Sequence, residues 1–306
     1  YDADKPDEPL DQSNSQTDGE NVRIQVEAGK TYKVRVFATG HLAFNPDYDL
    51  LFKPIGSAQN YAVLFSGGVS ANNNHQRYYD STRRLYETLV NTLDVPADHI
   101  YVLFGDGTDA GVDQNPSSGP NINSDMSYAT NVLSATEANL QTTLTTTIRN
   151  LVDANDHFLF WSFDHGSGTH PDVNYSGYDA NAATIFNEES VNGWGWSQEP
   201  RDDELAACLA QVDAGYITAV HGQCFAGGMQ DDLQPTPLKT FSMAATNHYE
   251  FSYGDLFVDE FNNALEAGHT KTWDAYVYAH DNDSLAITRG TYTGNQGTYT
   301  SGKEHP

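Results

Sequence analysis

No stretch of this 306-residue sequence is apolar over the ~18–20 residues that a membrane-spanning helix requires. The first residues also lack the basic and then apolar pattern of a signal peptide, and form a polar, acidic stretch instead. We therefore expect no membrane insertion. A leader removed before Tyr1 would leave no trace, and the low lysine content with abundant Asn, Thr, Tyr and Gly favours a secreted bacterial protein.

Basic residues are scarce as well. Fifteen Lys and Arg stand against 42 Asp and Glu, which gives a formal net charge of −27. A surface this acidic repels nucleic-acid phosphates and anionic lipid headgroups, so we expect no nucleic-acid partner. The excess of acidic residues is typical of a solubility-enhancing or salt-adapted surface, with calcium loading as the alternative.

The sequence has only two cysteines, too few for the disulfide framework of a small secreted domain. Cys208 lies in a helical pattern, where a buried thiol that packs as a small apolar group is the usual interpretation. Cys224 follows an apolar run and precedes a pair of glycines, in the stretch HGQCFAGGM. Cys224 is therefore the candidate for a reactive thiol.

Three parts follow one another along the chain. Residues 1–19 are polar and acidic, which predicts a disordered tail or linker. Residues 20–57 contain two runs of alternating apolar residues around Ala28-Gly29-Lys30, which predicts a small β segment with a hairpin. This segment resembles part of the pre-peptidase C-terminal domain, a small β-sandwich often appended to secreted bacterial peptidases. Residues 58–306 form the third and largest part.

Residues 58–306 alternate short apolar runs with amphipathic periods, which predict buried strands and helices respectively. This alternation is typical of an α/β fold, a mostly parallel sheet with helices on both faces. Ser134 and Glu137 predict a capping box at the start of the second helix. The predicted strands are 61–65, 99–104, 157–163, 215–220 and 240–246, and the predicted helices span 78–93, 140–151, 205–212, 255–267 and 272–280.

Two of the predicted strands end in residues suited to catalysis. The third runs into Asp164-His165-Gly166, and the fourth into His221-Gly222-Gln223-Cys224. Because the functional loops of parallel sheets lie beyond the carboxyl ends of the strands, we expect His165 and Cys224 to meet there. A neighbouring imidazole favours the nucleophilic thiolate, and flanking glycines let backbone N–H groups approach a substrate carbonyl.

Each of these residues alone also has a purely structural explanation. A single His at a strand end is usually a surface or capping residue, and a single Cys beside glycine is usually inert. His221 is a rival base because it precedes Cys224 by only three residues. That odd spacing along a strand puts the two side chains on opposite faces, so we prefer His165.

The order His-Gly and then a strand-ending Cys resembles the clan of cysteine peptidases that contains caspases, gingipains, separase and legumain. The details are most similar to legumain, over roughly residues 60–290. The resemblance implies a caspase–hemoglobinase-like fold. The stretches that carry it are Phe163-Asp164-His165-Gly166-Ser167, residues 222–229, residues 72–76, Ala245-Thr246-Asn247 and Ser252-Tyr253-Gly254-Asp255.

The resemblance to legumain also implies roles for individual residues. Cys224 would attack the scissile carbonyl, and His165 would give a proton to the leaving amine and activate the hydrolytic water. Backbone N–H groups of Gly166 and Cys224 would hold the oxyanion, and Asn72 would orient the imidazole. Asp164 matches an Asp that precedes the catalytic His in legumain, with a loop-capping carboxylate as the alternative.

The substrate pocket is where the sequence departs from legumain. The resemblance places Asn74 where the family has an Arg and Gly222 where it has a Glu, so a preference for Asn is not carried over. The segment between His165 and Cys224 is longer than in the family, and residues 169–195, together with Trp194 and Trp196, predict a flap. This flap either grips substrate or covers a hydrophobic edge. The residues predicted to bind substrate are Asn74, His75, Gly222, Gln223, Ser252 and Asp255.

One loop is a candidate for calcium. Asp106, Asp109 and Asp113 supply hard oxygen donors on a glycine-rich turn, without the spacing of an EF-hand. A solvated acidic loop is the alternative interpretation, and no other cofactor is indicated.

The sequence thus predicts a secreted cysteine endopeptidase acting on peptide or protein substrates through a Cys-His dyad and a thioester. Two alternatives stay open. The first is a catalytically silent binding module, and the second is a transpeptidase in which an amine captures the same thioester.

Overall fold

The structure, a computed structural model, describes Tyr32 and residues 57–168, 189–230, 232–233, 240–246, 251–252 and 254–284. The chain divides into two units, Tyr1–Phe52 and Lys53–Pro306. The predicted tail lies outside the described residues, as does the predicted β segment except for Tyr32 and residue 57. All elements named below belong to the second unit.

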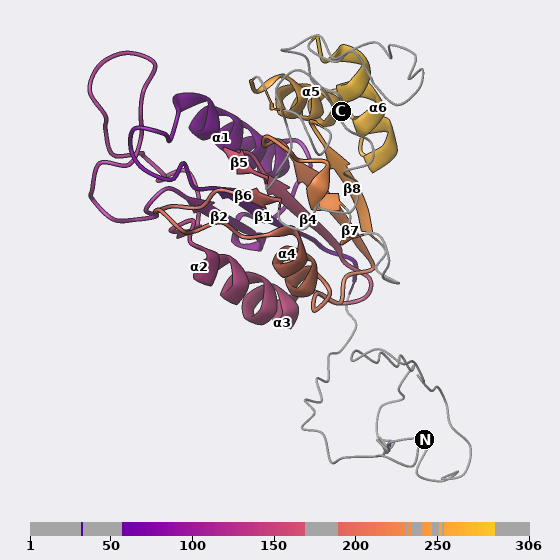
Figure 1. The fold of residues 1–306 in the computed structure, drawn as a ribbon. Helices are drawn as coiled ribbons and strands as arrows, with labels where there is room; N and C mark the ends of the chain where they lie inside the picture. Colours follow the sequence, from indigo (N-terminus) through magenta and orange to yellow (C-terminus); the bar gives the residue numbers. More distant parts are fainter. Residues whose placement is uncertain are drawn as a thin grey trace, which may run out of the picture. The chain divides into compact units, whose positions relative to one another are not determined.

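A single six-stranded sheet forms the centre of this unit, in the order β3-β2-β1-β4-β7-β8, and all of its neighbouring strands are parallel (Figure 1). The α/β prediction is therefore confirmed. A separate antiparallel pair joins β5 and β6. The strands are β1 (Asn60–Ser66), β2 (Ile100–Phe104), β3 (Asn131–Leu133), β4 (His157–Ser162), β5 (Gly166–Ser167), β6 (Ser190–Val191), β7 (Tyr216–His221) and β8 (Thr240–Ala244).

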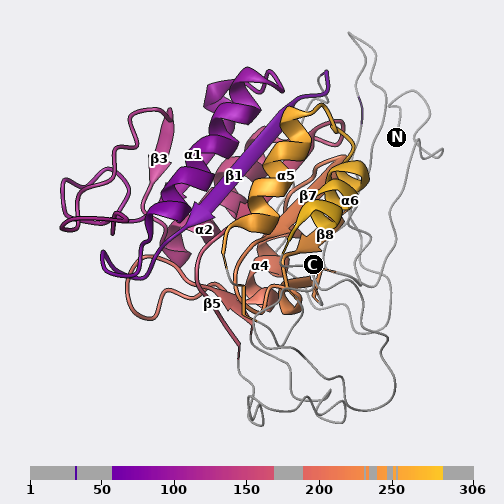
Figure 2. The same cartoon turned by 90° about the horizontal axis from the view of Figure 1, so that it is seen from above.

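Helices cover both faces of the sheet (Figures 1 and 2). One face carries α1 (Gln76–Asn91), α5 (Leu256–Glu266) and α6 (Thr272–Asn282). The other carries α2 (Glu137–Thr142), η2 (Thr143–Ile148), α3 (Arg149–Leu151) and α4 (Asp202–Leu209). Two short 3-10 turns, η1 (Ala97–His99) and η4 (Gly228–Gln230), complete the described elements.

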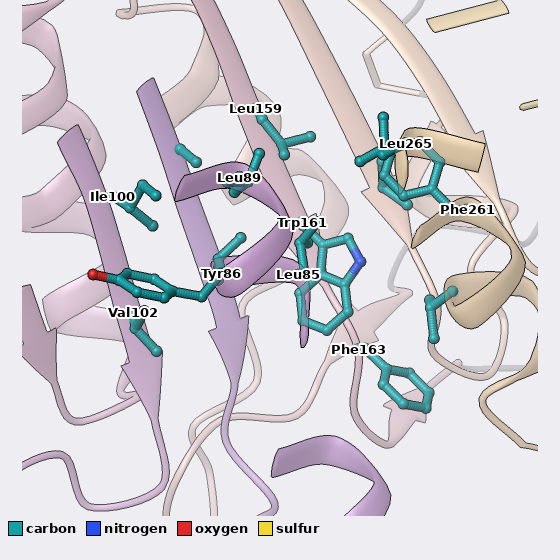
Figure 3. Close-up of a cluster of buried hydrophobic side chains, with 14 of the residues drawn as sticks. Leu85, Tyr86, Leu89, Ile100, Val102, Leu159, Trp161, Phe163, Phe261 and Leu265 are labelled. Atoms are coloured by element: carbon teal, nitrogen blue, oxygen red, sulfur yellow. The ribbon is translucent and has the colours of Figure 1, made fainter. Parts of the chain in front are cut away.

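Each face of the sheet has its own apolar core. Leu85 and Leu89 of α1 pack with Trp161 of β4 and Phe261 of α5 on one face (Figure 3). On the other face, leucines of α2, η2 and α4 pack with Phe158 and Phe160 of β4. Burial of each large side chain contributes ~1.5–3 kcal/mol. Strand β4 is apolar on both faces because it supplies side chains to both cores.

The predicted strands and helices agree with the structure to within a few residues, and the differences have local causes. The second helix starts at Glu137, because Thr136 rather than Ser134 accepts the hydrogen bond of the N-cap, from the Asn139 N–H. That helix also widens into a π-helix at η2. The sequence did not predict β3, β5 and β6, which have only two or three residues each.

The strand order fixes where a site can lie. From β1 the chain crosses by α1 to β2 on one side, whereas β4 continues by α4 to β7 on the other side. In open parallel sheets, ligands bind beyond the carboxyl ends of the strands at this point of divergence, here β1 and β4. Separately, no helix within the described residues has the length and apolar character needed to cross a bilayer.

Candidate active site

The ends of β4 and β7 stay in register as they leave the sheet. Ser162 pairs with His221, an offset of 59 residues (221 − 162), and the Gly222 N–H donates to the Ser162 carbonyl at 2.8 Å. Cys224 follows His165 by the same 59 positions (224 − 165). Continued in register, the two segments therefore bring His165 and Cys224 to the same level beyond the sheet edge.

Gly166 shows that the two segments remain in contact. A Cβ atom at Gly166 would lie 2.1 Å from the carbonyl oxygen of Cys224 and 2.8 Å from Cγ of Gln223. Any larger residue would push the Cys224 loop away, so only glycine permits this approach. The predicted neighbours, His165-Gly166 and Cys224, are thus together in the fold.

The N–H group of Gly166 points away from β6. Gly166 pairs with Val191 in the β5–β6 ladder, and the Asn192 N–H donates to the His165 carbonyl at 2.9 Å. Bonded and non-bonded pairs alternate along an antiparallel ladder, so Gly166 belongs to a non-bonded pair. Its N–H is therefore not used in this ladder.

The Cys224 thiol is half-buried beside residue 252. Its Sγ lies 3.3 Å from the backbone nitrogen of Ser252 and 3.7 Å from the Ser252 carbonyl oxygen. An N–H group directed at sulfur stabilises a thiolate. The next residue, Phe225, has φ of +59°, a costly conformation for an aromatic residue, and its ring packs on Phe251 at 5.0 Å. Strained backbone of this kind concentrates at functional sites.

The His165 imidazole is held by a backbone carbonyl. Its Nε2 lies 3.1 Å from the carbonyl oxygen of Asn73, which can only accept, so Nε2 carries the proton. In the neutral ring Nδ1 is then the basic nitrogen. Burial lowers the pKa of His165 from its usual value; the Asn73 contact opposes this, and the nearby Arg77 cation lowers the pKa further.

Two aromatic rings fix the plane of His165. The rings of His75 and Tyr78 each lie 5.4 Å from it, edge to face. The pKa of Tyr78 is raised, chiefly by burial and then by Asp164, with a smaller contribution from Cys224. The Tyr78 ring thus contacts the imidazole of the proposed base directly. No hydrogen bond joins the imidazole to Cys224 in the described structure, and such bonds commonly tighten only when substrate binds.

Asp164 is a loop-capping carboxylate, the alternative that the sequence left open. It is buried and accepts hydrogen bonds from the Ser66 hydroxyl and from the N–H groups of Gly68 and His165. Burial raises the pKa of Asp164 to about 7, although these donors act in the opposite direction. The carboxyl group ties the loop after β1 to the loop that carries His165.

His221, the rival base, lies inside the sheet. It is fully buried, and its Nδ1 is 3.2 Å from the Ser162 hydroxyl. Its ring packs on Phe160, in the core between the sheet and helices α2 and α4. Burial lowers the pKa of His221 to about 3. A histidine in this position stays neutral and has no access to substrate.

Asn72 and Asn74 differ from what the resemblance implied. Asn72 is exposed, its side-chain oxygen accepts from Asn121, and the orienting contact to His165 comes instead from the Asn73 backbone. Asn74 is fully buried, and its amide donates to the Asp113 carbonyl at 2.7 Å. A buried side chain cannot contact substrate, so Asn74 has a structural role.

The other predicted substrate-binding residues divide into two groups. Gly222 and Gln223 are buried: a Cβ at Gly222 would meet Val258 at 2.4 Å, and Gln223 accepts from the Ser162 hydroxyl at 3.0 Å. Ser252 lies against the thiol, and Asp255 begins α5 as a partly exposed residue. His75 lies against His165. Only Ser252, Asp255 and His75 are therefore placed to meet a substrate.

The acidic loop does not form a metal centre in the structure. Asp113 is buried and accepts from the Ser124 N–H and hydroxyl. Burial raises the pKa of Asp106 to about 6, with Asp113 and Asp109 adding to the effect. Within the described residues, no group of three or more His, Cys, Asp or Glu is arranged to hold a metal ion. The calcium site thus has no support from this geometry.

Three features of the site were not predicted from the sequence: the Asn73 carbonyl, the Tyr78 ring and the Arg77 cation. Tyr78 is the first residue of the predicted helix 78–93, and nothing in that helical pattern indicated its contact with His165. A backbone carbonyl has no side-chain signature, so no sequence pattern could have indicated Asn73. The predicted flap lies outside the described residues up to position 188, and Trp196 beyond it is exposed.

The chain has distant similarities among solved structures. No family model matches it, and no curated protein matches it. A structural-genomics target protein from Geobacter sulfurreducens is 11% identical over 81% of this chain and 98% of its own, with a TM-score of 0.44. A secreted C11 cysteine protease from Bacteroides thetaiotaomicron, in complex with an irreversible peptide inhibitor, is 13% identical over 78% of this chain and 63% of its own, with a TM-score of 0.39.

Neither of these two likenesses singles out legumain, so the resemblance to that family stays a prediction. At such scores the likenesses support no conclusion about activity. The geometry around Cys224 and His165 is therefore the basis for assigning a function.

Proposed function

We propose that this protein is a cysteine peptidase in which Cys224 is the nucleophile and His165 is the base. The observation that carries the proposal is the common register of β4 and β7, which brings the two residues to one level of the sheet edge. The contact between Gly166 and the Cys224 carbonyl supports it, because it shows that the segments do not diverge beyond the strands.

The surroundings of the two residues suit acyl transfer. The Cys224 proton passes to Nδ1 of His165, and Sγ attacks the scissile carbonyl carbon. The imidazolium then gives that proton to the leaving amine as the C–N bond breaks, which leaves a thioester. Water, deprotonated by the neutral imidazole, attacks the thioester and releases the acid and the thiol.

Four backbone groups around the dyad support this mechanism. The Gly166 N–H, directed away from β6, is a candidate donor to the oxyanion together with the Cys224 N–H. The Ser252 N–H at 3.3 Å from Sγ stabilises the thiolate before attack. The Asn73 carbonyl fixes the tautomer with the proton on Nε2, so the basic nitrogen is Nδ1.

The test is covalent labelling of the intact protein with peptidyl acyloxymethyl ketones, which react with an activated thiol, followed by mass spectrometry. We expect a single adduct in the wild-type protein and none in Cys224→Ala. Cys208→Ala is the matched control: Cys208 is the second thiol, is also half-buried, and has a pKa raised by burial. It should label like the wild type.

A second arm asks whether the label reports catalysis. Hydrolysis of a fluorogenic peptide library should be lost in Cys224→Ala and kept in Cys208→Ala. Two outcomes would contradict an activated dyad and favour a silent binding module. One is labelling of Cys208 and Cys224 at equal rates, and the other is a labelling rate that does not change in His165→Ala. Adding a peptide amine to the assay distinguishes a ligase from a hydrolase, because capture of the thioester by the amine gives a product of higher mass than hydrolysis does.

A further inference from the structure

A cavity of about 310 Å³ opens beside the proposed catalytic histidine. His75, at its border, packs edge-on against the His165 ring at 5.4 Å, so the cavity and the dyad share a wall. The lining is polar and includes no carboxylate. It consists of His75, Gln76 and Arg77 at the start of α1, with Asn115, Pro116 and Ser117 from the loop after β2.

The loop that closes this cavity is fixed by hydrogen bonds. The Asn115 N–H donates to the Asn74 carbonyl at 2.8 Å, and its side-chain amide donates to the Asn72 carbonyl at 2.8 Å. The Ser117 N–H donates to the Gln76 side chain at 2.9 Å. The cavity is therefore formed before any ligand enters, which lowers the entropy cost of binding.

Arg77 is the cation of this cavity, and no carboxylate of the described residues pairs with it. Its guanidinium lies 4.7 Å from the centre of the Tyr78 ring and donates to the Tyr78 hydroxyl at 3.0 Å. Its Nε is buried without a hydrogen-bond partner. Among the described residues, none of the ion pairs includes Arg77.

Three other arginines in the described part of the chain pair with carboxylates, whereas Arg149 contacts the Gln211 side chain instead. Arg83 pairs with Glu87 at 2.8 Å, Arg84 with Glu266 at 2.9 Å, and Arg201 with Asp203 and Glu204. With 42 acidic and 15 basic residues, a carboxylate is readily available to any cation. The first turn of α1 nevertheless contains no acidic residue, so its helix dipole adds to the positive potential.

We propose that this cavity binds a carboxylate of the substrate, so that the peptidase prefers Asp or Glu adjacent to the bond that it cuts. Arg77 is the specificity-determining residue, and the inference rests on the proposed function of Cys224 and His165. A guanidinium binds a carboxylate through two parallel N–H donors, and the semi-enclosed position strengthens that pair. The corresponding amide offers no charge to Arg77 and is rejected relative to the acid.

Two probes that differ only in Asp against Asn beside the acyloxymethyl ketone test this directly. The wild-type protein should be labelled about tenfold to a hundredfold faster by the Asp probe, the range expected for one charged hydrogen-bonded pair. Peptide substrates can carry the same Asp-to-Asn exchange before or after the scissile bond. On the side whose residue enters the cavity, the Asp substrate should have a kcat/KM higher by the same factor.

Variants on α1 assign the preference to one side chain. Arg77→Met should abolish most of the Asp-over-Asn ratio, and Arg77→Lys, which keeps the charge without the bidentate geometry, should retain part of it. Arg83→Met is the matched control, because Arg83 lies on the same helix but is exposed and paired with Glu87. It should keep the wild-type ratio.

The outcomes separate this inference from the proposed function. Equal labelling by both probes, at Cys224 only, would overturn the inference and leave the peptidase assignment in place. So would a preference that persists in Arg77→Met. The absence of labelling by either probe would overturn both. The wild-type comparison needs no variant, so it stands even if Arg77→Met fails to fold.

Discussion

At the end of β7, His221 belongs to the last residue pair of the sheet, whereas at the end of β4, His165 lies three residues beyond that pair. His221 is fully buried on Phe160, and burial lowers its pKa to about 3. His165 is only partly buried, and burial lowers its pKa while the Asn73 carbonyl opposes that shift. A histidine in the last β4–β7 pair is thus a core residue, whereas a histidine three residues beyond that pair is a candidate base.

The polar residues just before the dyad differ in the same way. Asp164 and Gln223 occupy matching positions of the two segments (223 − 164 is again 59), and both are buried. Asp164 accepts hydrogen bonds from the loop after β1, so the β4 end is tied to its neighbour through a carboxylate. Among the described residues, the Gln223 side chain accepts a hydrogen bond from Ser162 of the adjacent strand alone. The β4 end organises the site, and the β7 end supplies the thiol.

Substitution of the two histidines should give the largest and most opposed effects. His165→Ala should lower kcat/KM by ~10²–10⁴-fold, the usual range for a lost general base, while its stability changes by about 1 kcal/mol. His221→Asn should instead cost about 2 kcal/mol of unfolding free energy, because a buried ring leaves the core, and keep activity well below its melting temperature. Peptide hydrolysis and urea unfolding measure the two effects. Similar profiles for both variants would remove the distinction between the strand ends.

The next largest effect concerns the paired buried residues. Asp164→Ala should lower the free energy of unfolding by about 3 kcal/mol and impair activity, because it leaves the N–H groups of Gly68 and His165 without their acceptor. Gln223→Ala should cost less, since its only side-chain hydrogen bond among the described residues is with the Ser162 hydroxyl. Urea unfolding followed by circular dichroism gives both values. Equal losses would show that the carboxylate does not organise the site.

The smallest effect is a shift of the pH profile. A general base must be neutral, and burial together with Arg77 places the pKa of His165 below its usual 6.5. Activity should therefore persist below pH 6.5 and fall only as the imidazole is protonated. Removal of a nearby cation makes imidazolium easier to form, so Arg77→Met should move the acid limb of kcat/KM to higher pH. An acid limb that stays in place in this variant, measured with an uncharged substrate, would separate Arg77 from His165.

Much of the fold followed from the sequence because its signals are local. Apolar runs such as 157–163 and 215–220 predicted buried strands, and the stripes of α1 and α5 predicted helices on a parallel sheet. The short strands β3, β5 and β6 were missed because two or three residues are too few to show the apolar alternation of a strand. The capping residue of α2 was misplaced because Ser134 and Thr136 are both good N-cap residues, and only the packed structure selects between them.

By itself, the sequence determined that a His and a Cys follow two strands of one parallel sheet, at positions that the strand register can match. Only the tertiary structure decided that the Asn73 backbone, rather than the Asn72 side chain, holds the imidazole, and that Asn74 is enclosed. It also decided that Arg77 has no carboxylate beside it in the described structure, in a chain rich in acid. These contacts join residues far apart along the chain, and which atoms meet depends on packing rather than on local pattern.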